Sequence, residues 1–217
     1  MRFGRGEQLT ASSGQQAKLA RPMDWIAITD HSDGMGTIDG VRDGNPEMMA
    51  DPTVKRWHDM MAKGGDEAIK AKIEVVTAQG QGKAPKVLAD PKWMTTAWQQ
   101  TVDIMEKYNE PGKFTAFISY EWTSNATDGS NLHRNVIFRD NATKAGVTVP
   151  YTTMQPLGSD NPVDLWKWMA GFEEKTGGKM LAIAHNGNLS NGLMFDDVTL
   201  TTKKPLDRDY AERRMRW

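Results

Sequence analysis

Four short apolar runs are the feature that most limits what this chain can fold into. They comprise residues 23–29, 114–120, 135–138 and 180–184, and each has the length and composition of a buried strand. Because the runs are apolar at successive positions, both faces of each strand are expected to be buried. Segments of helical composition fill most of the intervals. The pattern predicts an α/β fold with a mainly parallel sheet covered by helices.

Helix signals lie between and after these runs. Pro91 fits the first turn of a helix over residues 91–108, in which apolar side chains recur on one face. Asn161, followed by a proline, is typical of the start of a helix, and the glycines at 177–178 predict its end near residue 176. Further helices are expected over residues 47–63, 66–78 and 207–217.

The composition excludes several classes of function. The 217 residues carry 27 lysines and arginines against 28 aspartates and glutamates, so there is no basic field for nucleic acid, and the expected substrate is small. No run approaches the roughly 18 apolar residues of a membrane span. Cysteine is absent, so any metal is held by imidazole and carboxylate. Residues 1–6 lack the core of a secretory signal, which leaves the compartment open, including a periplasmic or secreted parent protein.

Three of the four histidines lie beside the ends of predicted strands. His31 follows the first run, His133 precedes the third, and His185 follows the fourth. Strand ends on one face of a parallel α/β sheet converge, and Glu121, which follows the second run, joins them by the same logic. If the second and third runs form a hairpin, Glu121 and His133 lie at the same end. The set predicts a divalent-metal centre of zinc, manganese or iron.

Each of these residues also has a structural interpretation. A single histidine at a strand end is more often a hydrogen-bonded structural residue, and only the combination of three with a glutamate favours a metal. Asp30 is either a ligand or a group that orients an imidazole. Asp33, Asn186 and Asn188 either contact substrate or are turn residues. His58, within a predicted helix, is expected at the surface.

Several motifs resemble a known family. Residues 29–34, TDHSDG, look like the second metal motif of the PHP superfamily, named for polymerase and histidinol phosphatase domains. The likeness is more specific to an uncharacterised bacterial branch of PHP-like proteins, the domain of unknown function 3604. It extends over essentially the whole chain and includes residues 118–125 (ISYEWTSN), 131–138 (NLHRNVIF) and 184–190 (AHNGNLS).

The resemblance implies a distorted (β/α)7 barrel with two or three metal ions at the C-terminal ends of its strands. It also implies hydrolysis, mostly of phosphoesters, in which the metals activate water. His31 is then the ligand of the second motif and Glu121 the bridging carboxylate. His133 and His185 are the later imidazole ligands.

Two further residues are expected to take part in catalysis. Arg134, beside a predicted ligand, is a candidate for holding an anionic substrate by paired hydrogen bonds. Asp30 is the second, through its position next to His31. The expected partner of the site is therefore a small anionic substrate.

Two motifs of the family are not found in the sequence. The family opens with a His-x-His pair and closes with an Asp-x-His pair, and this chain contains neither. We therefore expect a single domain over residues 1–217 that is truncated at both ends, with an incomplete barrel and an incomplete metal site. The expected parent protein is a metal-dependent hydrolase of a small anionic ester.

Three alternatives remain open at this point. The substrate could be a sulfate ester or an amide, since activation of water is common to all of these reactions. The chain could be a catalytically inactive binding fragment that keeps the fold. Finally, the missing strands could come from a second copy of the chain in a homo-oligomer.

Overall fold

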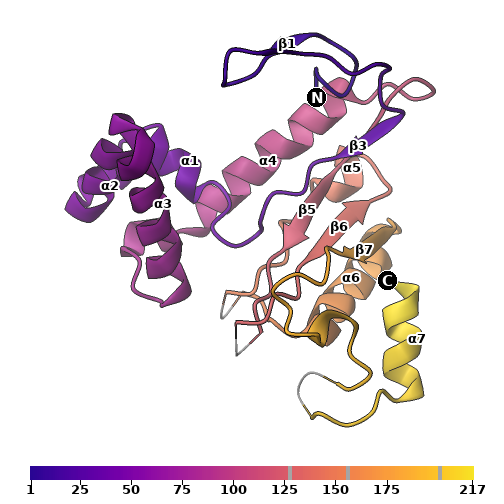
Figure 1. Ribbon diagram of the computed structural model, residues 1–217. Coiled ribbons are helices and arrows are strands. Elements are labelled where there is room, and N and C mark those ends of the chain that lie inside the picture. Colours follow the sequence, from indigo (N-terminus) through magenta and orange to yellow (C-terminus); the bar gives the residue numbers. More distant parts are fainter. Residues whose placement is uncertain (127–128, 155–156, 200–201) are drawn as a thin grey trace. The chain divides into compact units, whose positions relative to one another are not determined.

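The computed structural model describes residues 1–126, 129–154, 157–199 and 202–217 (Figure 1). By their internal contacts they divide into two compact units. One comprises Met1–Asp33 with Thr101–Trp217, and the other comprises Gly34–Gln100. Helix α4 (Pro91–Tyr108) contributes residues to both units. None of the described helices combines the length and the apolar character that a bilayer crossing requires.

The unit of residues 34–100 is helical. It contains α1 (Thr37–Arg42), η1 (Met48–Ala50), α2 (Pro52–Lys63), α3 (Gly65–Gly80) and η2 (Lys86–Ala89). The Asp51 carboxylate caps α2 by accepting from the backbone N–H groups of Thr53 and Val54. Gly64, with φ 73°, separates α2 from α3. The predicted helices over 47–63 and 66–78 are confirmed, except that residues 48–50 form a separate 3-10 turn.

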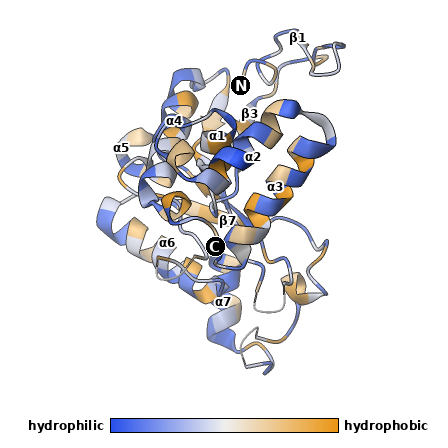
Figure 2. Ribbon diagram, turned by 90° about the vertical axis from the view of Figure 1, so that its left-hand side faces the viewer, coloured by the Kyte–Doolittle hydropathy of each residue, from blue (hydrophilic) through white to orange (hydrophobic). Residues whose placement is uncertain are grey.

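The helical unit has its own apolar core. Val54, Trp57 and Val75 are among its buried side chains. Figure 2 shows both hydrophobic and hydrophilic residues along α3. His58 of α2 is half-buried and its Nδ1 lies 2.9 Å from the carbonyl oxygen of Val41, so the expectation of a surface histidine is corrected.

The other unit is built on small sheets. Its strands are β3 (Trp25–Ala27), β4 (Thr115–Phe117), β5 (Ser119–Trp122), β6 (Arg134–Phe138) and β7 (Met180–Ala184), preceded by a short pair, β1 (Leu9–Thr10) and β2 (Gln16–Ala17). β3 pairs with β4 in parallel, and β5, β6 and β7 form an antiparallel sheet in that order (Figure 1). Only Ile118 separates β4 from β5.

The observed pairing directions agree only in part with the predicted parallel sheet. A parallel pair of the first two predicted strands is confirmed. The third and fourth predicted strands are antiparallel to their neighbours, which corrects the expectation of a mainly parallel sheet. The described residues between β5 and β6 form no crossover helix, and an antiparallel neighbour of this kind returns the chain as a hairpin. The described strands form no closed barrel, and the barrel stays a prediction.

The two faces of the β5–β6–β7 sheet have different surroundings. Helix α6 (Pro162–Thr176) packs on one of them, where the rings of Phe138 and Phe172 lie 5.2 Å apart and those of Tyr120 and Trp168 lie 6.3 Å apart. We call this the covered face. On the other, the open face, the outer strand β7 leaves apolar side chains exposed, such as Ile183 at 51%.

Short elements complete this unit. They are α5 (Ala142–Ala145), η3 (Leu193–Phe195) and α7 (Arg208–Arg216). The ring of Tyr210 on α7 lies edge-on to that of Trp166 on α6, at 5.1 Å between centroids. This contact holds α7 beside the helix that covers the sheet.

Candidate metal centre

A parallel bridge between two strand ends brings the first two predicted ligands together. His31 pairs with Glu121 in the direction of the β3–β4 ladder. The N–H of Glu121 donates to the carbonyl oxygen of Asp30 at 2.8 Å, and the N–H of Ser32 donates to the carbonyl oxygen of Glu121 at 2.8 Å. Because paired residues of adjacent strands project from the same face, the side chains of His31 and Glu121 lie side by side.

The antiparallel strands add the other two histidines to the same face. Glu121 pairs with Asn135, and His133 lies two residues before Asn135, so all three side chains project together. The N–H of His185 donates to the carbonyl oxygen of His133 at 3.0 Å, which extends the β6–β7 ladder by one step. The predicted hairpin, with Glu121 and His133 at one end, is confirmed.

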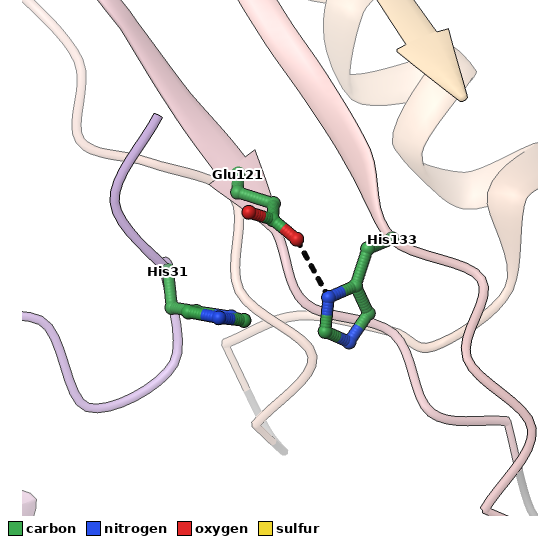
Figure 3. A group of neighbouring side chains, drawn as sticks. All are labelled: His31, Glu121 and His133. Atoms are coloured by element: carbon green, nitrogen blue, oxygen red, sulfur yellow. Dashed lines mark hydrogen bonds and ion pairs between the residues drawn. The ribbon is translucent and has the colours of Figure 1, made fainter. Parts of the chain in front are cut away.

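The ligand atoms converge at the open face. One nitrogen or oxygen atom from each of His31, Glu121 and His133 lies within 4.8 Å of the others, and the three side chains point toward one another (Figure 3). His133 Nδ1 is 2.6 Å from Glu121 Oε1. His185 lies at the margin, with its Nε2 4.0 Å from the same oxygen. The group of three could hold a metal ion, with His185 within reach of it.

The charge of the Glu121 carboxylate is uncompensated. Glu121 is only 5% exposed, and in the described part of the chain its ion-pair contacts are with the imidazoles of His133 and His185. A buried carboxylate without a cationic partner is costly, because the interior replaces none of the stabilisation that water provides. The site therefore favours the binding of a cation.

The surroundings of His133 indicate the same. Its Nδ1 faces the Glu121 carboxylate, and its Nε2 lies 3.2 Å from Oδ1 of Asn125. Burial lowers the pKa of His133, with the nearby carboxylate opposing the shift, so the ring is neutral at pH 7. A neutral imidazole carries a hydrogen on only one of its two nitrogens. In one of these two contacts, therefore, a nitrogen without a hydrogen faces an oxygen acceptor. A cation between the imidazole and the carboxylate removes that conflict.

Thr123 is a residue of the site that the sequence did not reveal. Its hydroxyl donates to the carbonyl oxygen of Glu121 at 3.0 Å, and the hydroxyl oxygen, Oγ1, lies 3.1 Å from Nδ1 of His31. With its only hydrogen already donated, Oγ1 accepts from His31 Nδ1–H, which leaves Nε2 with the lone pair that a ligand needs. Its position two residues after Glu121 on an extended segment could have identified it.

Asn135 leaves an acceptor without a partner on this face. Its Oδ1 is buried and accepts no hydrogen bond from any described residue. The residue pairs directly with Glu121 across the two strands. Because buried polar atoms are nearly always hydrogen-bonded, this oxygen fits a site that receives a donor from a ligand.

The two predicted catalytic residues lie elsewhere. Arg134 follows His133 and pairs with Trp122, so its side chain projects from the covered face and not toward the metal ligands. Asp30 is exposed and is not in the group of three residues whose ligand atoms converge. Alternation corrects the expectation that Arg134 holds a substrate anion beside the metal, and a catalytic role for Asp30 stays a prediction.

The flanking polar residues behave as structural groups. The Asp33 carboxylate accepts from the backbone N–H of Thr153 at 2.9 Å and from the hydroxyls of Thr152 and Thr153. Asp33 thereby fastens the loop that follows His31. The Asn186 side chain accepts from the N–H of Asn188 at 3.0 Å, which is the pattern of a turn.

Comparison with known proteins gives a match to a family model. The matching family is DUF3604, which is described as 'Protein of unknown function', and its model covers residues 1–217. Searches of curated proteins and of solved structures found no match to the chain. The function must therefore be argued from the geometry of the site.

Proposed function

This chain belongs to the DUF3604 family, and we propose that it carries the metal centre of a metal-dependent hydrolase that acts on a small anionic ester. The observation that carries the proposal is the buried Glu121 carboxylate, which contacts imidazoles and has no cationic partner in the described part of the chain. The likeness of the motifs to the PHP superfamily supports a phosphoester as the first substrate class to test.

The donor set fits a divalent ion. His31, Glu121 and His133 would hold it, with His185 as a fourth ligand or a ligand to a second ion. Neutral imidazole with carboxylate suits zinc, manganese or iron. When bound, such an ion supplies a Lewis acid that activates water and neutralises the charge that develops on the leaving group.

The protein's own side chains orient the ligands and leave access to the site. Thr123 fixes the imidazole of His31, and Asn125 Oδ1 accepts from Nε2–H of His133 when Nδ1 faces the ion. The side chains of His31 and His185 are exposed, so a small ester and a water molecule can approach from the open face. Asn135 Oδ1 is free to accept a hydrogen bond from substrate or water.

Metal binding is the first test of this proposal. The chelator-treated protein is titrated with Zn²⁺ and with Mn²⁺ by calorimetry, beside the variants His133→Ala and His58→Asn. We expect His133→Ala to weaken binding at least about 100-fold, because even partners that only orient a ligand contribute roughly 10- to 100-fold. His58→Asn, which removes the histidine of α2, should bind as the unmodified protein does. Equal affinity in all three proteins would contradict the proposed centre.

Hydrolysis is the second test. The natural gene product that contains residues 1–217 is loaded with metal and assayed with aryl phosphomonoesters, phosphodiesters, sulfate esters and amides, with and without chelator. Chelator-sensitive release from a phosphoester supports the proposal, and release from the sulfate ester or amide alone would change the substrate class. Metal binding without any hydrolysis would contradict the hydrolase and leave a binding domain of the same fold.

A further inference from the structure

A small cavity lies on the covered face of the sheet, on the side opposite to the metal ligands. β6, the segment that follows η3, and α7 line it, with Arg134, Asp196, Tyr210 and Arg214 as its polar groups. Its volume is about 20 Å³, above the roughly 10–15 Å³ that one water molecule needs. The space is large enough for at least one water-sized group, such as an oxygen atom of a ligand.

Arg134 is a buried cation that lacks a counter-charge. The residue is 7% exposed, and its guanidinium donates to the carbonyl oxygen of Leu132 at 2.9 Å and lies over the ring of Trp122 at 5.8 Å. No carboxylate of a described residue lies within ion-pair distance. A guanidinium has five N–H donors, and a buried charge without a partner is costly. The cavity beside it is the place from which an acceptor can reach the remaining donors.

Arg214 adds a second guanidinium to the same cavity. The other arginines of α7 each pair with a carboxylate: Arg208 with Glu212, Arg213 with Asp209, and Arg216 with Glu173. Arg214 instead donates to the backbone carbonyl oxygen of Asp196 at 3.1 Å and has no carboxylate partner among the residues described. Its charge is therefore available to a ligand.

The remaining polar groups leave the cavity positive. The Asp196 carboxylate accepts from the backbone N–H of Val198 at 3.3 Å and lies beyond ion-pair distance from both guanidinium groups of the wall. Burial raises the pKa of the Tyr210 hydroxyl, which therefore keeps its proton and can donate. Two guanidinium groups, one hydroxyl and one carboxylate give an excess of one positive charge.

We propose that this cavity binds a small oxyanion between the guanidinium groups of Arg134 and Arg214, with the Tyr210 hydroxyl as a further donor. Planar guanidinium groups match the oxygen atoms of carboxylate and phosphate groups. Carboxylate and phosphate are both small anions. The site is separate from the proposed metal centre, because Arg134 and His133 are consecutive residues that face opposite sides of the sheet.

The test measures thermal unfolding against inorganic phosphate in chelator-treated protein, at constant ionic strength maintained with chloride. We expect a saturable rise of the midpoint temperature in the unmodified protein, since a ligand that binds only the folded state stabilises it by mass action. Arg214→Gln should weaken the apparent affinity by at least about tenfold, because a charge-assisted hydrogen-bonding group is removed. Arg208→Gln removes the same charge from an exposed position of α7 and should leave the response unchanged.

Further variants and further anions complete the test. Arg134→Met should lose the response as Arg214→Gln does, and if it fails to fold, the half-exposed Arg214 decides the outcome alone. His133→Ala should keep the full response, which separates this site from the metal centre. Sulfate and acetate titrations distinguish a tetrahedral oxyanion from a carboxylate. A response that is absent, that does not saturate, or that is equal in Arg214→Gln and Arg208→Gln would overturn the proposal.

Discussion

Consecutive residues at the start of β6 serve opposite faces of one sheet. His133 projects from the open face beside Glu121, a buried carboxylate that lacks a cation among the described residues. Arg134 projects from the covered face, where its guanidinium lacks an anion in the same part of the chain. Each face therefore holds one buried charge that has no counter-charge among the described residues, and the two charges have opposite signs. The alternation of a strand thus lets one short segment prepare two sites of different chemistry.

The faces also differ in how much packing supports them. Phe138, at the end of β6, is fully buried against α6. Ile183, on the neighbouring strand but on the open face, is 51% exposed. A side chain in contact with solvent contributes less to stability than one enclosed on all sides. We infer that the covered face supplies most of the folding stability and that the open face is free to carry reactive groups.

Truncating one residue on each face gives the largest expected effect. Phe138→Ala should reduce the free energy of unfolding by about 3–5 kcal/mol, because it leaves a cavity in a packed interior. Ile183→Ala should reduce it by less than about 1 kcal/mol, because half of that side chain already contacts water. Urea denaturation measures both values. Equal losses would show that the open face is covered in solution and would remove the contrast between the faces.

The next effect is the loss of metal affinity on the open face. Glu121→Gln keeps the shape of the side chain and removes its charge, so the affinity for Zn²⁺ should fall by about 100-fold. The metal-free variant should not be less stable, because a buried charge without a counter-ion has been removed. Glu110→Gln is the matched control, since that glutamate pairs with Arg5 and Lys113 away from the site. If titration calorimetry gives the same Zn²⁺ affinity for the unmodified protein, Glu121→Gln and Glu110→Gln, Glu121 is excluded as a ligand.

Local signals in the sequence were sufficient for the elements that position the site. The helix over Pro91–Tyr108 and the strand over Met180–Ala184 have the predicted bounds. Asn161 caps α6 as expected, by accepting from the N–H of Val163. Proline, asparagine and glycine act within one turn of the chain, so these boundaries do not depend on distant contacts. The convergence of His31, Glu121 and His133 followed from the same strand ends.

Properties that depend on pairing partners were harder to predict. The direction of β7 is set by its neighbour β6, and no residue within Met180–Ala184 encodes it. The division of the chain into two units likewise depends on contacts between distant segments. The wrong prediction that Arg134 lies at the metal site has a different cause. Two adjacent residues of a strand cannot face the same side, so assigning His133 to the site already excluded Arg134 from it.

A smaller effect is expected where a side chain acts through a ligand. Thr123→Val removes the oxygen that accepts from His31 and should weaken metal binding by about tenfold, the lower end for partners that orient a ligand. Thr123→Ser keeps that oxygen and should restore most of the affinity. Zinc titration of the two variants distinguishes orientation of His31 from simple packing, because a packing role would make serine the more harmful substitution.

The smallest effect is expected at Arg134, although the residue is as buried as His133. Without an anion, Arg134→Met removes an unpaired interior charge and keeps most of the side-chain volume, so the free energy of unfolding should rise or change by less than about 1 kcal/mol. Denaturation in chloride buffer measures this value. A loss of several kcal/mol would mean that the guanidinium already has an anionic partner within the protein. In that case the charge on the covered face would be structural, and only the open face would carry a binding site.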